Sequence, residues 1–333
     1  MNETASRHAA RSTGTELPAR ARPQRDGLAA AAFVLPLAAI FTGFYLWPAA
    51  STIASSLFRW GLLNPWRATR PHDWDFVGLH NYSATLTDHD FWNAAINTAI
   101  WLVVFPLLVT GFSLAISILI WWAGRGSVLF RTVFILPMTI SLTAAGVIWS
   151  FVYNPDPDLG VLNAVLGVVG LGDSHQWLSG LGAIDLGSVE IRFVNLSLVV
   201  AAFWAFAGFG VITFTAGLTS ISQDLVEAAI VDGARARHIV RHVLLPTLRR
   251  PVVIVAIVSV IFALRVFDIV YVMTQGGPAQ DTEVLALLLW QEAFAFLDTP
   301  AGGLATAIAV LLSGVLLAGG YPYLRRLAKG SQR

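Results

Sequence analysis

Two ionisable residues stand inside an otherwise apolar stretch of this sequence, and their spacing lets them act together. Arg265 and Asp268 are three positions apart, which places both on one face of a helix, and Tyr271 follows one turn later. A charge placed in lipid costs about 3 kcal/mol or more, so this face is expected to line the protein interior or a wet cavity. Two roles stay open: a surface where Asp268 accepts hydrogen bonds from hydroxyl groups while Tyr271 stacks on a ring, or an ion pair that only joins two helices.

The sequence lacks the patterns that carry enzymatic chemistry. Cysteine is absent, which excludes disulfides, thiolate metal sites and thiol nucleophiles. The one lysine, Lys329, follows Ala328, whereas a phosphate-binding P-loop has its lysine after a glycine. No Gly-x-Ser-x-Gly elbow, Ser-His-Asp order or His-Glu-x-x-His helix occurs either. We therefore predict no catalytic residue and no cofactor in this chain.

One pair of histidines has the spacing of metal ligands. His238 and His242 lie four positions apart and therefore on the same helical face. A zinc site takes at least three protein ligands, and no third ligand is evident. Arg237 and Arg241 beside the pair also disfavour a cation. We expect no metal here.

The composition is that of a membrane protein. Of 333 residues, 56% are hydrophobic and 12% charged, with a mean hydropathy of +0.68, whereas an average soluble domain carries about 25% charged residues. The net charge of +1 gives no basis for binding nucleic acid. A helix needs about 20 mainly apolar residues to cross the hydrocarbon core. Six stretches qualify: 28–50, 94–122, 128–153, 193–218, 251–274 and 302–324.

Charges in the connections predict the orientation. Arginine and lysine are retained on the cytoplasmic side, and they gather in alternate connections, while aspartate and glutamate gather in the others. We therefore predict a multi-pass protein of the cytoplasmic (inner) membrane with both termini cytoplasmic. Residues 1–27 lack apolar periodicity and are predicted to be a disordered cytoplasmic tail, followed by one transmembrane domain at 28–333. A shorter apolar stretch, 161–171, fits a helix lying against the outer face.

The connection between the fourth and fifth stretches, residues 221–250, is too polar to span a membrane. Asp224 and Glu227 lie where acidic residues favour the start of a helix, and Gly233 can adopt the positive φ that ends one. A second helix over 235–244 would end near Pro246, which cannot continue the hydrogen-bond ladder. An isolated loop of this composition is more often only a solvated connection. Small residues nevertheless leave room for another surface to approach: Ala228, Ala229 and Gly233.

The same loop carries a long motif. Glu227-Ala228-Ala229, Asp232-Gly233-Ala234 and Leu245-Pro246 match, at the same spacing, the EAA loop of binding-protein-dependent ABC importer permeases. The resemblance implies an all-α, six-helix fold of the type I importer permease, in which the 224–246 segment forms helices that sit in a cleft of a separate ATPase. It also differs from the family, which commonly has Phe and Ile where Val240 and Val243 stand. The resemblance assigns ATPase coupling to Glu227, Ala228, Ala229, Asp232, Gly233, Ala234, Leu245 and Pro246. Within this set the Glu227 to Gly233 half is expected to contact the ATPase, and the rest to orient it.

Further motifs resemble the carbohydrate branch of these permeases. They are 76–82, Asn97-Thr98, 158–163 and 267–278, the last being typical of the first permease of a sugar importer. The resemblance implies a second related permease, two ATP-binding subunits that hold ATP and magnesium, and an extracytoplasmic sugar-binding protein. An α-glucoside or another small oligosaccharide is the first expected substrate, and glycerol phosphate the second. Arg265, Asp268 and Tyr271 would then line the substrate path.

A rival class stays open at this point. A self-contained secondary transporter would use an ion gradient, with Arg265 and Asp268 as its coupling residues. Recovery of an ATPase and a second permease with this chain would favour the importer, whereas proton-coupled uptake by this chain alone would favour the rival. A membrane receptor would need a cytoplasmic signalling domain, and no cytoplasmic segment of this sequence is long enough for one.

Overall fold

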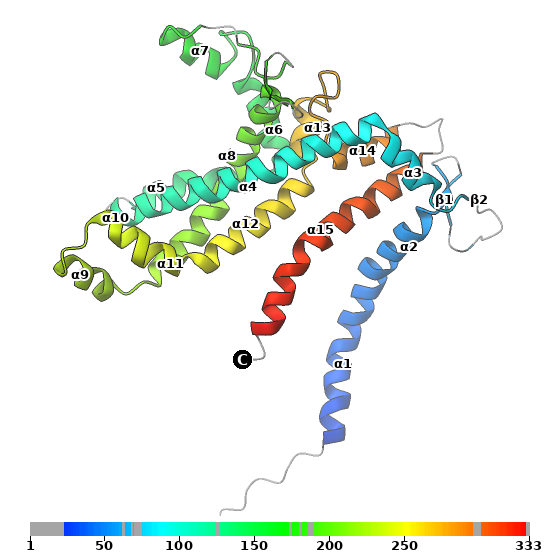
Figure 1. Cartoon of the computed structure of the whole chain (residues 1–333), viewed down its shortest axis with the longest axis horizontal. Coiled ribbons are helices and arrows are strands. Elements are labelled where there is room, and N and C mark those ends of the chain that lie inside the picture. Colours follow the sequence, from blue (N-terminus) through cyan, green and yellow to red (C-terminus); the bar gives the residue numbers. More distant parts are fainter. Residues whose placement is uncertain are drawn as a thin grey trace, which may run out of the picture. The chain divides into compact units, whose positions relative to one another are not determined.

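The computed structural model describes residues 23–61, 64–67, 69, 75–123, 127–172, 175–179, 182–185, 190–295 and 301–330. Most of them are helical (Figure 1). The chain forms two units, residues 1–51 and 52–333. Helices dominate because the long apolar stretches satisfy their backbone groups only by hydrogen bonding within themselves.

The first unit contains the first predicted span as a helix. α1 (Pro23–Phe41) continues through η1 (Thr42–Leu46), one turn of π-helix, into α2 (Trp47–Ser55). The stretch from Ala31 to Ser55 is long and apolar enough to cross a membrane. Residues 1–22 of the predicted disordered tail lie outside the described residues. Residues 23–27 of that tail are helical, because Pro23 occupies the first position of a helix, which proline favours.

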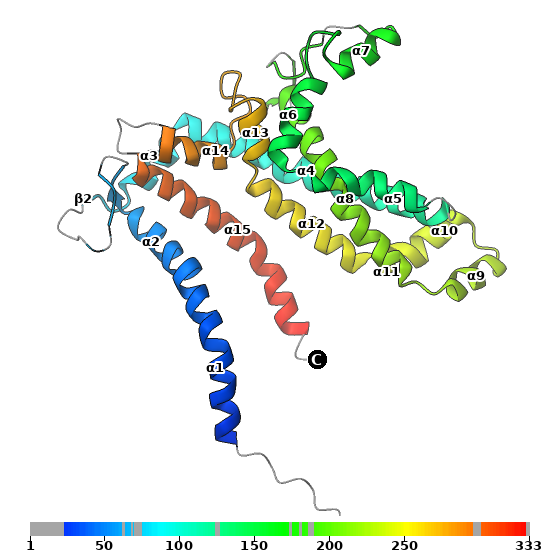
Figure 2. The same ribbon diagram turned by 180° about the vertical axis from the view of Figure 1, so that it is seen from behind.

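The second unit is built on three helices that pack against one another (Figures 1 and 2). They are α4 (His89–Ala123), α8 (Phe193–Thr219) and α12 (Arg249–Leu264). Small residues let their backbones approach closely. A Cβ atom on Gly210 of α8 would lie 2.5 Å from Oγ of Ser113 in α4. The Ser113 hydroxyl also donates to the carbonyl of Ala207 at 3.0 Å, which ties α4 to α8.

A continuous apolar core joins this bundle to the 221–250 loop. Trp101 and Phe105 of α4 are completely buried in it. The Phe105 ring stacks on that of Phe262 with centroids 4.7 Å apart. The same core contains residues of the loop and of its junctions with the bundle: Leu218, Val226, Ile239, Leu244 and Leu248. The loop and the bundle are therefore joined through closely packed side chains.

Two predicted spans are broken rather than continuous. The third consists of α5 (Ser127–Ile135), the 3₁₀ turn η3 (Leu136–Thr139) and α6 (Leu142–Val152), with a bend of 105° between its halves. Pro137 lies in the turn, and Ser141 starts the new helix by accepting a hydrogen bond from the Ala144 N–H at 3.2 Å. The fifth is interrupted between α12 and α13 (Asp268–Met273).

The predicted all-α class is confirmed, with two short antiparallel strand pairs added. β1 (Phe58–Arg59) pairs with β2 (Asp75–Phe76), and β3 (Ala183–Asp185) with β4 (Glu190–Arg192). Three helices within the described residues are long and apolar enough to span, or five if each bent pair counts as one span. α15 (Gly302–Gly330) begins where the sixth predicted span begins. The remaining outer elements are α3 (His80–Thr87), α7 (Val161–Val168), α14 (Leu285–Trp290) and η5 (Gln291–Ala295).

Candidate functional site

Helix α9 (Gln223–Val231) ends two residues before Gly233, the glycine that the sequence predicted to end it. Gly233 has a φ of 80°. Its N–H donates to the carbonyl of Ile230, and the Ala234 N–H donates to that of Ala229, both at 2.9 Å. These two bonds form a Schellman motif, which satisfies carbonyls that the end of a helix leaves unpaired. The chain therefore makes a defined turn at Gly233 and is not a slack connection.

The predicted coupling residues divide into an inward and an outward set. Val226 is the buried residue of α9, and Ala229 and Ala234 are half-buried against the same core. The outward set is exposed: Glu227, Ala228, Asp232, Gly233, Leu245 and Pro246. Apart from Gly233 and its two chain neighbours, no atom of the described residues lies within 4 Å of a Cβ atom built on Gly233. The turn is thus open for another surface to approach.

Helix α9 also exposes apolar side chains that sequence spacing did not single out. Its large exposed hydrophobic residues are Leu225, Ile230 and Val231, and Val231 is 86% exposed. Acidic residues surround them, because Asp224, Glu227 and Asp232 are exposed as well. We call this set of six residues the α9 surface. An apolar patch with a polar rim is the usual composition of a protein interface.

The second predicted helix, 235–244, extends slightly further than expected. The helix continues without a sharp bend through α10 (Ala236–Ile239), the π turn η4 (Val240–Leu244) and α11 (Leu245–Thr247), and it ends at Thr247. Pro246 stands one residue before the end of this run, in agreement with the expectation that the helix ends near it. The chain then bends by 65° into α12. Ile239, Leu244 and Leu248 are buried and fix this helix to the bundle.

The two histidines of this helix interact with each other and with its backbone. The His238 and His242 rings stack with centroids 6.2 Å apart. Nδ1 of His242 lies 3.1 Å from the carbonyl oxygen of His238. In the tautomer that carries a proton on Nδ1, this nitrogen donates to that carbonyl and cannot bind a metal ion. Among the described residues no group of three or more His, Cys, Asp or Glu side chains is arranged to hold a metal ion.

Arg265 and Asp268 do not share one continuous helix, contrary to the expectation from their spacing. α12 ends at Leu264, Phe267 has a φ of −141°, and Asp268 begins α13. No ion pair joins the two side chains within the described part of the chain, and both are exposed. The expected pairing geometry is therefore wrong, because the helix breaks between the two residues. Tyr271 is also exposed.

The break assembles three aromatic rings beside these charges. Phe267 stacks on Tyr271 with centroids 5.3 Å apart and planes 13° apart. Trp290 of α14 meets Tyr271 edge-on at 5.0 Å and contacts Phe267 at 5.9 Å. Sequence spacing suggested Tyr271 alone, because Trp290 belongs to a separate helix and only the fold brings it here. Of the three rings, Tyr271 is exposed, whereas Phe267 and Trp290 are half-buried.

A set of polar side chains that sequence reasoning did not connect holds the loop after α13. Asn97 donates to the carbonyl of Glu283 at 2.9 Å. Asn195 of α8 donates to the carbonyl of Asp281 at 2.8 Å and to Oδ1 of Asn97 at 3.2 Å. We call the following residues, each of which bonds to this loop or the start of α14, the polar clamp: Asn93, Asn97, Thr98 and Asn195. The clamp fixes the chain that directly follows the 267–278 motif, at residues 280–285.

The clamped loop has an unusual backbone and an ion pair of its own. Three non-glycine residues have positive φ angles: Gln275, Ala279 and Gln280. Such angles cost of order 1 kcal/mol each and persist where surrounding contacts fix them. Arg192 at the start of α8 pairs with Asp281 at 2.9 Å. The loop after α13 is therefore held rigidly against α4 and α8.

Glu283 lies at the end of this loop in an environment that disfavours its charge. Its exposed fraction is 2%, and its Oε2 has no hydrogen-bond partner among the described residues. Burial raises the pKa of Glu283 to about 7, and the carboxylates of Asp90, Glu292 and Asp88 add to the rise. Burial likewise raises the pKa of Glu292. Sequence spacing offered no signal for this group, because its members come from α4, the loop and η5.

Comparisons with known proteins find similar sequences and a similar fold among transport permeases. An osmoprotective compounds uptake permease of Synechocystis is 32% identical over 84% of this chain and 93% of its own length. An α-glucoside transport system permease of Rhizobium meliloti is 30% identical over 84% of this chain and 77% of its own. A solved bacterial ABC transporter for alginate import contains a chain with the same fold, at a TM-score of 0.71, 19% identity and coverage of 89% and 93%.

A family model extends this agreement along almost the whole chain. The family described as binding-protein-dependent transport system inner membrane component matches residues 27–329. That range includes the α9 turn, the broken fifth span and the polar clamp. The fold and the relatives agree with this match, as the EAA motif predicted. The chain therefore belongs to the inner-membrane permease family of binding-protein-dependent ABC transport systems.

Proposed function

We propose that this permease moves a sugar into the cell by alternating access, driven by ATP hydrolysis on partner subunits. A di- or oligosaccharide such as an α-glucoside is the substrate class that the sugar-permease motifs and the Rhizobium relative support. The working complex contains a second homologous permease, two ATP-binding subunits with ATP and magnesium, and an extracytoplasmic sugar-binding protein. It lies in the inner membrane with both termini of this chain cytoplasmic. The observation that carries the proposal is the construction of α9.

Helix α9 is fixed on one side and available on the other. Val226 and Ala229 attach it to the core that continues through Leu218 and Leu248 into the bundle. The α9 surface faces outward with three apolar side chains, each of which contributes about 1.5 to 3 kcal/mol when fully buried. An ATPase that covers this surface would therefore hold the helix firmly. Closure of two ATPases would move α9, and the packed core would pass that movement to α8 and α12.

Loss of the exposed valine tests this docking. Val231→Asp places a carboxylate in the middle of the α9 surface, and we expect the ATPase to be lost when the complex is purified through this chain. Thr247→Asp is the matched control, because Thr247 is also exposed on the same connection but lies outside α9. Retention of the ATPase by Val231→Asp would remove the docking assignment.

The substrate path is proposed along the break in the fifth span. Asp268 would accept hydrogen bonds from sugar hydroxyls, while Tyr271, supported by Phe267 and Trp290, would stack on the sugar ring. The exposure of Arg265 and Asp268, without an ion pair between them, supports this role over a purely structural one. Charged groups in a membrane region face a wet cavity or a partner, because lipid would not solvate them.

Neutral replacement of the acid separates the two roles. Asp268→Asn should reduce sugar uptake while leaving assembly with the partners and basal ATP hydrolysis unchanged, and Asp158→Asn in the outer turn should leave uptake intact. Normal uptake by Asp268→Asn would exclude Asp268 from the path. Uptake that persists without ATP and collapses with a protonophore would favour the secondary transporter instead.

A phosphorylated substrate is the second candidate, because Arg265 offers an exposed cation beside the same rings. A guanidinium pairs strongly with phosphate, which suits glycerol phosphate. Calorimetric titration of the cognate binding protein with an α-glucoside and with glycerol phosphate decides between them. Arg265→Gln provides the matching test on this chain: it should abolish uptake of a phosphorylated solute and reduce uptake of a neutral sugar much less.

A further inference from the structure

Helix α7 has its polar side chain inside and its apolar side chains outside. Asn163 is completely buried. Its Nδ2 lies 2.9 to 3.2 Å from three backbone carbonyl oxygens, and its Oδ1 accepts a hydrogen bond from the Trp177 indole at 2.9 Å. The outward residues are all apolar: Val161, Val165, Val168, Val169 and Leu171. A helix on a water-facing loop has the opposite arrangement.

We call these five outward residues the α7 face. Val168 alone is 90% exposed, and the stretch from Gly160 to Gly172 contains no charged residue. Asn163 is its one polar side chain and is fully bonded within the protein. The α7 face therefore has neither charge nor hydrogen-bonding side chain with which to select a polar partner. A contiguous surface of this kind marks an interaction site.

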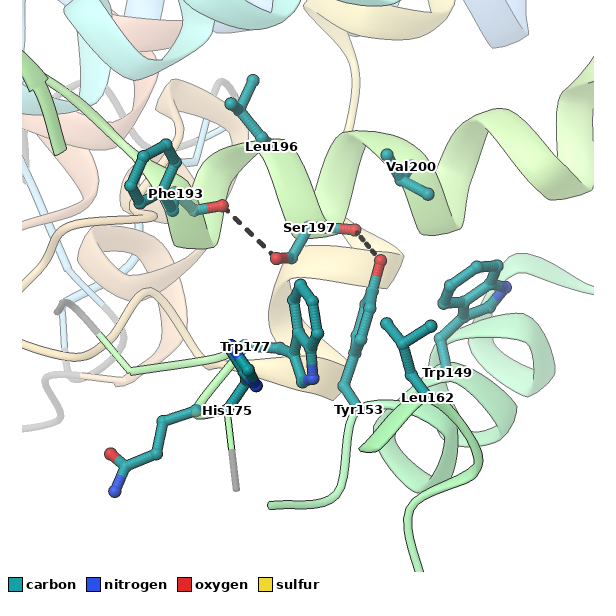
Figure 3. A pocket seen from close by; sticks show the side chains of 10 residues that line it. Trp149, Tyr153, Leu162, His175, Trp177, Phe193, Leu196, Ser197 and Val200 are labelled. Atoms are coloured by element: carbon teal, nitrogen blue, oxygen red, sulfur yellow. Dashed lines mark hydrogen bonds between the residues drawn. The ribbon is translucent and has the colours of Figure 1, made fainter. Parts of the chain in front are cut away.

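A pocket of about 660 Å³ opens beside α7 and has the same chemical character. Its walls are mainly aromatic and aliphatic, and Figure 3 shows the Trp177 ring between those of His175 and Tyr153. Its buried polar groups already have partners, since the Tyr153 hydroxyl donates to the carbonyl of Ser197 at 3.0 Å. The Ser197 hydroxyl donates to the carbonyl of Phe193. The exposed polar side chains of His175 and Gln176 also line it, but the rest of its walls are mainly apolar, so the pocket favours an apolar chain over a sugar, whose hydroxyls would each need a polar partner.

The elements that form the pocket place it at the edge of the membrane. Trp149 and Tyr153 stand at the end of α6, whereas Phe193 and Val200 belong to the start of α8, a helix long and apolar enough to span. The connection from α6 to Val161 is short. Helix α7 is thus tethered close to the level where these helices leave the hydrocarbon. Trp and Tyr concentrate at that level in membrane proteins.

We propose that α7 lies in the membrane interface with the α7 face among the lipid acyl chains, and that the adjacent pocket takes up one acyl chain of a phospholipid. The arginine distribution predicts that this is the extracytoplasmic leaflet. The segment acts as an anchor for the connection between α6 and α8. Helix α6 is one half of the broken third span, and α8 carries Asn195 of the polar clamp. Interfaces with proteins that bind and dissociate have a polar rim. The α7 face has no polar side chain that could pair with such a rim.

Spin labelling tests the position of α7 in the assembled importer. The chain contains no cysteine, so Val168→Cys and the control Asp158→Cys each give one labelled site without further changes. Both residues are exposed, so neither substitution removes a buried side chain that the fold needs. The labelled permease is assembled with cysteine-free partners in vesicles of phosphatidylethanolamine and phosphatidylglycerol. Collisions with oxygen, which enters lipid, and with a water-soluble nickel chelate are then measured.

The expected result is specific to lipid. The label at position 168 should collide readily with oxygen and several-fold less with the nickel chelate than the label at 158, with or without the binding protein. Free access of the chelate to position 168 would overturn the proposal. Shielding from both reagents would also overturn it, in favour of a protein partner, as would shielding that arises only when binding protein is added.

Pocket occupancy has its own readout. Val200 lines the pocket and is partly exposed, so Val200→Trp fills the space without disturbing the core. Native mass spectrometry of the importer should show one fewer retained phospholipid in Val200→Trp than in the wild type. Ile212→Trp, at another exposed position of α8, is the control and should retain all of them. Equal retention by Val200→Trp and the wild type would exclude the acyl chain from the pocket.

Discussion

Substitution of Gly233 by aspartate provides the sharpest test of coupling. Gly233 has a φ of 80°, in the left-handed region where a residue with a side chain pays about 1 to 2 kcal/mol. Within the part of the chain that the structure describes, no atom beyond the two chain neighbours of residue 233 lies within 4 Å of the new Cβ, so no steric clash adds to that figure. A folded domain has about 5 to 15 kcal/mol of stability, which tolerates this loss. Gly233→Asp should therefore insert and fold.

The same substitution should nevertheless disrupt docking. It places a carboxylate at the exposed turn, next to Asp232, where we propose that the ATPase closes over the chain. An uncompensated charge buried in an interface costs about 3 to 5 kcal/mol. Each 1.4 kcal/mol corresponds to a tenfold change in binding, so the ATPase should bind more than about 100-fold more weakly. Sugar uptake should fall accordingly while the amount of permease in the membrane stays the same.

The assay compares binding-protein-stimulated ATP hydrolysis and sugar uptake in proteoliposomes. Gly233→Asn is the matched control, because asparagine has nearly the shape of aspartate, tolerates the left-handed region and carries no charge. Gly233→Ala measures the backbone cost alone. Wild-type uptake in Gly233→Asp would refute the docking assignment. Equal loss in Gly233→Asn and Gly233→Asp would show that backbone strain, rather than charge at an interface, causes the effect.

Three further predictions concern stability and pH. Gly210→Leu should prevent close packing of α4 and α8, since even a Cβ would lie 2.5 Å from Ser113 Oγ, and the purified permease should lose several degrees of melting temperature or fail to accumulate, unlike Gly314→Leu in open space. Asn97→Ala leaves the Glu283 carbonyl without its Asn97 donor and removes one of the two bonds that Asn195 donates, so it should destabilise by about 1 to 3 kcal/mol, measured by thermal unfolding in detergent, with Asn93→Ala at the exposed edge costing less. Because the pKa of Glu283 is raised from 4.5 to about 7, the folded state holds this proton more tightly than the unfolded state, so stability should fall as pH rises from about 4.5 to 7 and then level off. Glu283→Gln should flatten that dependence, and an unchanged slope in this variant would assign it to other groups.

The coupling loop was predictable because its signals are local. Gly233 marks a left-handed helix end, and acidic residues mark the start of α9, so the helix and its turn followed from the sequence. The inward position of Ala229 and Ala234 did not, because it depends on which face of a nine-residue helix meets the bundle. The exposed apolar residues of the α9 surface were missed for the same reason.

The region of the proposed substrate path was harder to predict because its signals are non-local. The spacing of Arg265 and Asp268 assumed a continuous helix, and the break after Leu264 invalidated it. Apolar length identifies a membrane stretch, but it does not reveal where a helix breaks inside that stretch, as the bend of 105° between α5 and α6 also shows. Trp290, Asn195 and Glu283 meet the site only through tertiary packing. No pattern of spacing in one sequence connects them to it.

From the distribution of apolar and polar contacts we propose a path by which a movement at α9 reaches the loop after α13. At the α9 end the chain is joined to the bundle by closely packed apolar side chains such as Val226 and Leu248, which would pass a movement of α9 to the bundle. At the opposite end the loop after α13 is fixed by Asn97 and Asn195 through hydrogen bonds whose geometry tolerates little displacement. The breaks in the third and fifth spans lie between these ends. A rotation that begins at α9 would therefore be taken up at the breaks, where backbone hydrogen bonding is already interrupted, and Arg265 and Asp268 stand at one of them.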